Sequence, residues 1–333
     1  IGNGLDVAEN VLKNRMRDMI DNMIVVGSFK EGQEFYKTKS GSYIRVLNPG
    51  VEGQMTVQGA WQIQNGDKGL KVAKIYHQDN GEAYQVEGQV PMTSTKSLYM
   101  TLKEQAKYKQ FFDLANGSDA SDKKSALFSG TMENVKGDIT GVCANSGTNF
   151  NFTLFDNFNY TVYVPTNEAI QQLHDEGLLP TWSDYENLTV EDFGGDAAAL
   201  KDAQSKVAGR INDFLRYHIQ DNALFIGGEP INGGKYETSK MNGATKRFYS
   251  IEVTADDNAM VMKDQVNDAT RRVITEGSLY NIMGREYWIE TTGSGANERT
   301  QIYNASDVVV HQIDGVLLYE KSQLKPWRED ITW

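Results

Sequence analysis

The chain has almost no cysteine, since Cys143 is the only one among 333 residues. A single thiol excludes an intramolecular disulfide and any zinc site built from several thiolates. It does not distinguish an oxidising from a reducing compartment, because large domains fold without disulfides in both. A chain of this length can bury one large core or two ordinary ones.

Long apolar runs are also missing, and the longest ones are the length of a strand, far short of the ~20 residues that span a bilayer. Basic residues are outnumbered, because 33 Lys and Arg face 45 Asp and Glu, giving a net charge of −12. This excess of acid argues against a nucleic-acid partner held through its phosphates. We expect the lysines at 103–109 to lie on a solvated helix face. No charged-then-apolar leader follows Ile1, so we expect any signal or lipid anchor to lie outside these residues.

The motifs of common catalytic sites are absent, including G-x-S-x-G, H-E-x-x-H and the Walker loop. The four histidines, His77, His174, His218 and His311, show no i, i+4 pairing that would suit a metal. The acidic stretch 118–122 lacks the Gly and the distal Glu of an EF-hand loop, so we interpret it as a solvated turn. We therefore expect no enzyme activity, no metal and no cofactor. A pocket with convergent titratable side chains would revive the enzyme alternative.

Residues 160–170, YTVYVPTNEAI, indicate a strand that passes directly into a helix. Val and Tyr before Pro165 favour a pleated strand, and the proline cannot donate a hydrogen bond to a neighbouring strand. Thr166 and Asn167 carry side-chain oxygens suited to capping the orphan N–H groups of a helix. The sequence therefore predicts a strand that ends at Pro165 and a helix that begins one or two residues later.

The chain also repeats itself weakly in three places that keep their order. The matched pairs of segments are 17–29 with 212–225, 34–46 with 235–253, and 80–92 with 304–319. The offset grows along the repeat, so the second copy carries insertions. The first copy lacks the long, helix-rich front half that precedes the second, so residues 1–95 look like the back half of a domain. Half a domain leaves an apolar face uncovered. Either a disordered front half accompanies it, or its strands pack on the second copy.

The second copy begins with helices and continues with strands. Amphipathic spacing predicts helices over 97–115, 168–180 and 196–219. Short strands with glycine turns follow between residues 223 and 318. Helices first and strands afterwards predict an α+β domain with a helical front half and a compact β core.

Three segments of this sequence resemble motifs of a known domain family, and they follow one another in the same order as in that family. YTVYVPTNEAI resembles the first signature of fasciclin (FAS1) domains, and ASDVVVHQIDGVLLY at 305–319 resembles the second. Between them, Tyr217 and His218 match the Tyr-His segment of the family. The chain therefore resembles a tandem-repeat, bacterial, cell-surface fasciclin protein.

The first copy departs from this pattern. It has Gln85, Glu87 and Gly88 where the second copy has His311, Asp314 and Gly315, and Met23 where the second has His218. Any function of the family that depends on these histidines is therefore not expected in the first copy.

The resemblance implies a division of the chain and a set of motif residues. It implies a partial fasciclin-like unit at 1–95, a complete domain at 96–322 and a tail at 323–333, with insertions at about 116–150, 176–205 and 255–300. It also implies a structural role for the motif residues Thr161, Pro165, Thr166, Asn167, His311, Asp314 and Gly315.

Five aromatic or histidine residues are candidates for partner binding. The resemblance implicates Tyr217 and His218, because this pair binds partners in some animal adhesion proteins. The alternative, which we favour, is that both pack at the end of a helix. Trp182, Tyr287 and Trp288 lie in or beside the insertions, where exposed rings would make a platform for a sugar or a peptide. Burial under the insertions is the simpler alternative.

The resemblance implies a non-enzymatic adhesion protein of the extracellular space or cell envelope, which recognises a protein or a glycan without a cofactor. The acidic composition, the single cysteine and the insertions lead us to expect a bacterial protein. For such a protein, the resemblance implies an outer-membrane lipoprotein whose anchor lies outside these residues. The alternative is a structural accessory lipoprotein of an outer-membrane nutrient-import complex. In that case, the tail and the incomplete first unit would dock on the transporter.

Overall fold

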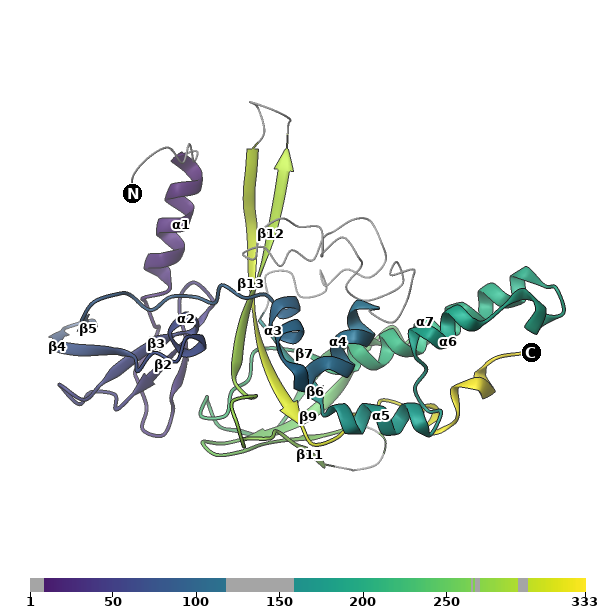
Figure 1. The fold of residues 1–333 in the computed structure, drawn as a ribbon. Helices are drawn as coiled ribbons and strands as arrows, with labels where there is room; N and C mark the ends of the chain where they lie inside the picture. The colour runs from purple at the N-terminus through teal and green to yellow at the C-terminus, as the bar shows by residue number, and fades with distance from the viewer. Residues whose placement is uncertain (1–8, 118–158, 265, 267–269, 293–298) are drawn as a thin grey trace.

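The computed structural model describes residues 9–117, 159–264, 266, 270–292 and 299–333. Helices are combined with two separate sheets, which confirms the predicted α+β class. Figure 1 shows the smaller sheet and α1 (Glu9–Asp21) on one side, and the larger sheet with most of the helices on the other. We call residues 9–95 the first unit and residues 96–322 the second unit, which the tail 323–333 follows.

The sheet of the first unit is an antiparallel meander. Its strands lie in sequence order: β1 (Phe35–Lys37), β2 (Tyr43–Leu47), β3 (Thr56–Gly59), β4 (Leu70–Gln78) and β5 (Gly81–Val86). The short helix α2 (Ala60–Gln64) follows β3 directly. In β2, every second side chain is buried, which is the period of a strand with one face on a core. This core contains Tyr36, Ile44, Val46, Met55, Val57 and Val72.

The sheet of the second unit has the strand order β11-β10-β9-β8-β7-β6-β13-β12. The strands are β6 (Tyr160–Pro165), β7 (Ile219–Asp221), β8 (Ile231–Met241), β9 (Phe248–Ala255), β10 (Met260–Lys263), β11 (Thr270–Arg272), β12 (Ile282–Thr292) and β13 (Arg299–Ile313). β6 pairs in parallel with β13 and antiparallel with β7. All six residues of β6 are buried, because neighbours flank both of its edges and packing covers both of its faces. It ends at Pro165, as predicted.

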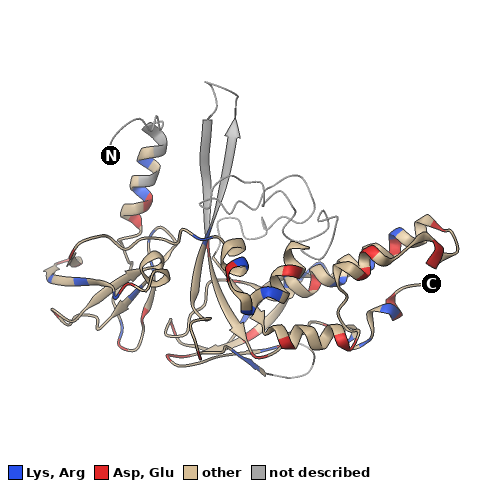
Figure 2. Ribbon diagram, in the orientation of Figure 1, with Lys and Arg blue, Asp and Glu red and all other residues tan. Residues whose placement is uncertain are grey.

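Helices cover the second unit. They are α3 (Leu98–Glu104), η1 (Ala106–Tyr108), α4 (Lys109–Asn116), α5 (Asn167–Asp175), α6 (Trp182–Asn187), η5 (Val190–Phe193), α7 (Ala197–Tyr217), and in the tail η7 (Lys321–Leu324) and η8 (Trp327–Asp330). Figure 2 shows Lys and Arg interspersed with Asp and Glu along these helices. The side chains of Lys103, Lys107 and Lys109 are exposed, as predicted. Among the described helices, none is both long and apolar enough to cross a bilayer.

The single helix predicted over 97–115 is wrong, because the chain breaks at Gln105, where the backbone is extended (φ −101°, ψ 108°). The break has a tertiary cause. It directs the hydroxyl of the buried Tyr108 to the carbonyl oxygen of Leu279, at 3.1 Å. It also lets the carbonyl oxygen of Ala106 accept a hydrogen bond from Asn167 Nδ2, at 3.0 Å. Helical spacing alone does not reveal these distant partners.

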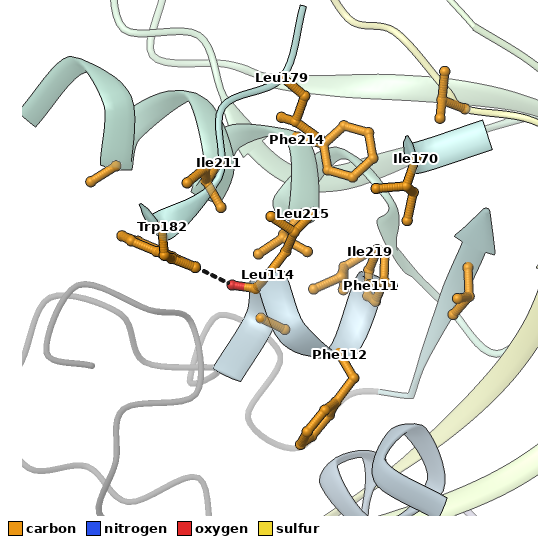
Figure 3. Close-up of a cluster of buried hydrophobic side chains, with 14 of the residues drawn as sticks. Phe111, Phe112, Leu114, Ile170, Leu179, Trp182, Ile211, Phe214, Leu215 and Ile219 are labelled. Carbon is orange, nitrogen blue, oxygen red and sulfur yellow. Dashed lines mark hydrogen bonds between the residues drawn. The ribbon is translucent and has the colours of Figure 1, made fainter. Parts of the chain in front are cut away.

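The main core lies where α4 and α7 pack over β6. Figure 3 shows Phe111, Phe214 and Leu215 converging there with Trp182 at the side. The indole N–H of Trp182 donates to the carbonyl oxygen of Leu114 at 2.7 Å, so its polar group is satisfied inside the core.

A separate apolar cluster joins the two units. It contains Phe35, Ala60, Ala223, Phe225, Met283 and Val309. The rings of Phe35 and Phe225 stack with their centroids 4.5 Å apart. Ser42 Oγ of the first unit donates to Asp307 Oδ2 of the second at 2.9 Å. Part of the face that residues 1–95 were expected to leave uncovered therefore packs on the second unit.

Candidate functional site

The strand-to-helix junction is held by hydrogen bonds of its own side chains. The hydroxyl of the buried Thr161 donates to the carbonyl oxygen of Asn222 at 2.7 Å and accepts from the N–H of Leu224 at 3.0 Å. Thr166 caps α5, because its side chain accepts from the N–H of Ala169 at 3.2 Å. Pro165 closes β6 opposite Ile313 of β13.

Asn167 ties this junction to the helices that precede it. Its Oδ1 accepts from the N–H of Gln110 at 3.0 Å, and its Nδ2 donates to Ala106. Both polar groups of the amide are therefore used within the fold. These contacts place Thr161, Thr166 and Asn167 in supporting positions.

His218 is completely buried, and both ring nitrogens have backbone partners. Nδ1–H donates to the carbonyl oxygen of Phe214 at 2.8 Å, and Nε2 accepts from the N–H of Leu317 at 3.1 Å. A ring that donates once and accepts once is neutral. Burial lowers the pKa of His218 to about 4, although the hydrogen bond to Phe214 opposes this shift.

His311 has the opposite tautomer. Its Nε2–H donates to the carbonyl oxygen of Leu224 at 2.9 Å, and its Nδ1 accepts from the N–H of Asn281 at 3.2 Å. Burial lowers the pKa of His311 to about 4 as well. Because all four nitrogens of the two rings are engaged, neither histidine is poised as a metal ligand or as a general base.

Asp314 and Gly315 complete the second signature. Asp314 exchanges two hydrogen bonds with the backbone of Arg272, at 2.9 Å and 3.0 Å. A Cβ at Gly315 would lie 2.8 Å from Nε of Arg271, which donates to the carbonyl oxygen of Val316. A larger residue at 315 would therefore displace the arginine.

The structure buries three of the five predicted binding residues. Tyr217, His218 and Trp182 have no exposed area, so in this conformation a partner cannot touch them. The hydroxyl of Tyr217 donates to the carbonyl oxygen of Ser250 at 3.2 Å. The backbones of Tyr287 and Trp288 pair on β12 with β13, and their side chains lie outside the described residues. The packing alternative is the one that this burial supports.

A cleft between the two units is the best candidate for a recognition site. Its volume is about 520 Å³. The first unit contributes Glu34, Phe35, Arg45, Ala60, Ile63 and Gln64, and the second contributes Lys96, Thr101, Glu104, Gln105, Ile226, Asp257, Gly277, Ser278, Tyr280, Asn281, Ile282 and Met283. A concave site between units, with apolar and polar residues together, is typical of ligand binding.

Opposite charges are paired in this cleft. Arg45 Nε donates to Glu34 Oε2 at 2.7 Å, and the guanidinium lies 5.9 Å from the centre of the Phe35 ring. Lys96 pairs with Glu104. Such a lining suits a ligand that is largely neutral and rich in hydrogen-bonding groups better than one that carries a high charge.

Two side-chain oxygen atoms of the residues that line the cleft form no hydrogen bond within the described structure. Thr101 Oγ1 and Gln64 Oε1 are buried and have no partner among the described residues. Because neither atom has accessible surface, a ligand in the cleft does not touch them in this conformation.

No motif in the sequence predicted this cleft, because its walls come from segments about two hundred residues apart. The one signal was the incomplete first unit, which had to rest on something. Among the described residues, no group of three or more His, Cys, Asp or Glu side chains could hold a metal ion. The acidic stretch 118–122 and Cys143 lie outside the described residues.

Comparisons with known proteins add little to this description. No family model matches the sequence, and it matches none of the curated proteins. The chain is similar to the solved structure of a FAS1 domain pair from the insect cell adhesion molecule fasciclin I, with 13% identity and a TM-score of 0.29. The match covers 93% of this chain and 82% of the other. Such low values do not establish a family.

Proposed function

We propose that this is a non-enzymatic, fasciclin-like binding protein of the cell surface, and that it recognises a protein or a glycan in the cleft between its two units. The cleft carries the proposal, because described residues of both units line one concave surface there. The two fasciclin-like signatures support the kind of protein, and the cleft supports where it binds.

The chemistry of the cleft favours recognition over catalysis. Its described lining contains no histidine and no cysteine, and its cations are paired with carboxylates. Half-buried Tyr280 and buried Phe35 supply ring surface, and half-buried Gln105 and exposed Ser278 supply an amide and a hydroxyl group. A glycan or a polar peptide uses this combination of ring and hydrogen-bonding surface.

Glycan and peptide arrays probed with the labelled chain test the proposal. We expect a ligand whose dissociation constant rises at least tenfold in the Lys96→Ala/Asp257→Ala variant, because both side chains line the cleft without belonging to the apolar core. The matched control is Lys206→Ala/Asp202→Ala, which removes an exposed ion pair on α7. Equal weakening by both variants, or none by either, would rule out the cleft as the binding site.

A second candidate is a structural accessory lipoprotein of an outer-membrane nutrient-import complex in a bacterial envelope. Trp333 and Leu324 of the tail favour it, because they are 54% and 47% exposed. A mild-detergent pull-down from native membranes tests this candidate. A transporter recovered in near-stoichiometric yield with the parent chain, but not with Leu324→Ser/Trp333→Ser, supports it. Recovery of the chain alone excludes it.

A further inference from the structure

The charged side chains that line the cleft do not balance one another. Arg45 is paired with Glu34 at 2.7 Å, and Lys96 is paired with Glu104. Asp257 is the remaining charged residue of the described lining, and it forms no ion pair or hydrogen bond with the described residues. Three carboxylates against two cations leave this lining with a net negative charge.

Asp257 lies in the tight turn between β9 and β10. The carboxylate of Asp256 caps this turn, because it accepts from the N–H groups of Asn258 and Ala259, both at 2.8 Å. The carbonyl oxygen of Asp256 accepts from the N–H of Gly227 at 2.9 Å, which ties the turn to the rest of the second unit. The turn therefore uses the carboxylate of Asp256, whereas that of Asp257 stays available for a ligand.

Gly32 of the first unit makes room for this carboxylate. A Cβ at position 32 would lie 2.9 Å from Asp257 Oδ2, so a larger residue there would push the carboxylate aside. The φ angle of Gly32, +81°, is also one that residues with a Cβ rarely adopt. Lys30, two residues earlier, pairs instead with Glu229, at 3.5 Å. The carboxylate of the second unit thus lies against the backbone of the first without an ion pair to it.

The aromatic ring of Tyr280 lies in the same part of the cleft lining. The side chain of the next residue, Asn281, accepts from the N–H of Ile226 at 3.1 Å and donates to its carbonyl oxygen at 2.8 Å. Gly227 follows Ile226 and donates to the turn that contains Asp257. Hydrogen bonds therefore connect the segment of the ring with the segment of the carboxylate. A cation that pairs with a carboxylate can also lie against an aromatic ring.

We propose that the cleft binds a polypeptide segment through one basic side chain, whose cation pairs with Asp257 and lies beside the ring of Tyr280. This inference rests on the proposed function, since it names the partner of the same cleft. One cation balances the net charge of the described lining. The net charge of the whole chain, −12, also attracts a basic partner from a longer distance.

The described lining favours a basic side chain over other cations. A metal ion needs several ligands, and no group of three or more His, Cys, Asp or Glu side chains in the described part of the chain could hold one. An amino sugar would need open rings for stacking, but the ring of Phe35 is only 6% exposed, because it packs against Phe225 and the guanidinium of Arg45. A lysine or arginine side chain reaches a carboxylate on a flexible stem and does not depend on stacking.

Matched peptides test the proposal on the full chain. The labelled chain is applied to an array of short, polar peptides that each contain one lysine, and to a second array in which each lysine is Nε-acetyllysine. Acetylation keeps the peptide backbone and removes the charge. A third array carries oligosaccharides of glucosamine and of N-acetylglucosamine. For the tightest lysine peptide, we expect a dissociation constant about tenfold lower than that of its acetylated form, because a charge-assisted hydrogen bond is lost on acetylation.

Variants of the chain assign this difference to Asp257. Asp257→Asn should weaken binding of the lysine peptide about tenfold and leave binding of the acetylated peptide unchanged. The matched control is Asp79→Asn, which changes an exposed aspartate in the turn between β4 and β5, outside the described cleft lining, and should alter neither. Added salt should weaken binding of the lysine peptide to the parent chain but not to Asp257→Asn. Because both aspartates are exposed, both variants should melt at the parental temperature.

The Tyr280→Ala variant separates failure of this inference from failure of the proposed function. Equal binding of the lysine and acetylated peptides, weakened in both cases by Tyr280→Ala, would overturn the basic side chain and leave the cleft as the binding site. Binding of glucosamine oligosaccharides alone, weakened by Asp257→Asn, would overturn the polypeptide and also leave the cleft. Binding of the lysine peptide that neither Asp257→Asn nor Tyr280→Ala alters, or no binding on any array, would overturn both the inference and the proposed function.

Discussion

Arg285 of the second unit donates two parallel hydrogen bonds to the carboxylate of Asp18 of the first, from Nη1 at 2.9 Å and from Nη2 at 2.8 Å. The arginine side chain is only 2% exposed, whereas that of Asp18 is 40% exposed. Burial raises the pKa of the neighbouring Asp307 carboxyl, and Arg285 opposes this rise. A buried cation of one unit is thus paired with a carboxylate of the other.

Asp18→Ala should lower the free energy of unfolding by about 2–3 kcal/mol, because it leaves a buried guanidinium with less compensation. Urea denaturation followed by circular dichroism measures this loss. Asp202→Ala, which breaks an exposed pair with Lys206, should cost less than about 0.5 kcal/mol. Equal, small effects of the two variants would show that the inter-unit pair does not stabilise the fold.

Phe225→Ala should uncouple the two units. The Phe225 ring stacks on Phe35 and lies 4.7 Å from the ring centre of Tyr43, so its removal opens a cavity between the units at a cost of about 3–5 kcal/mol. Calorimetry should then show the first unit melting before the second. Phe248→Ala, on β9 outside the inter-unit cluster, is the control and should leave the coupling of the two units intact. A single transition at the parental temperature in Phe225→Ala would contradict this prediction.

His311 should make stability depend on pH. Burial lowers its pKa to about 4 from an ordinary value of 6.5. Because the folded state disfavours the charged ring, this contribution is complete above pH 6.5 and is lost as the pH falls towards 4. A shift of this size corresponds to about 3 kcal/mol.

The His311→Gln variant tests that dependence by urea titrations at several pH values between 7.5 and 4.5. We expect the variant to be less stable than the parent at pH 7.5, because its hydrogen bonds fit less well. The difference should shrink as the pH falls. The control is Lys206→Ala on the exposed face of α7, which removes no histidine and should show the pH dependence of the parent. A constant difference between His311→Gln and the parent would exclude the histidine as its cause.

Thr161→Val should destabilise the chain by about 1–3 kcal/mol, although the two residues have nearly the same shape. The valine leaves the N–H of Leu224 and the carbonyl oxygen of Asn222 without the hydroxyl that they share. Thr161→Ser keeps the hydroxyl and should recover most of the loss. Thermal melting of the three proteins decides between the outcomes. A valine variant as stable as the parent would show that the shared hydroxyl does not stabilise this junction.

Local features of the chain were readable from the sequence. Residues within one turn of each boundary indicate where three elements begin or end. They indicate the end of β6 at Pro165, the cap at Thr166 and the start of the long helix after Asp196. The α+β class follows from the order of helical and strand periods. Backbone propensity and capping depend on a few neighbouring residues, so one sequence is enough to predict where such strands and helices begin and end.

Burial and proximity depended on the tertiary structure. Trp182 and Tyr217 have the composition of a binding surface, yet partners about thirty to seventy residues away enclose them in the core. The break at Gln105 and the cleft between the units have the same origin, because contacts between distant segments decide them. Leu12 and Val207 make the point most directly. Both occupy an apolar helix stripe, but Leu12 is 48% exposed and Val207 only 2%, and side-chain periodicity does not reveal this difference in burial.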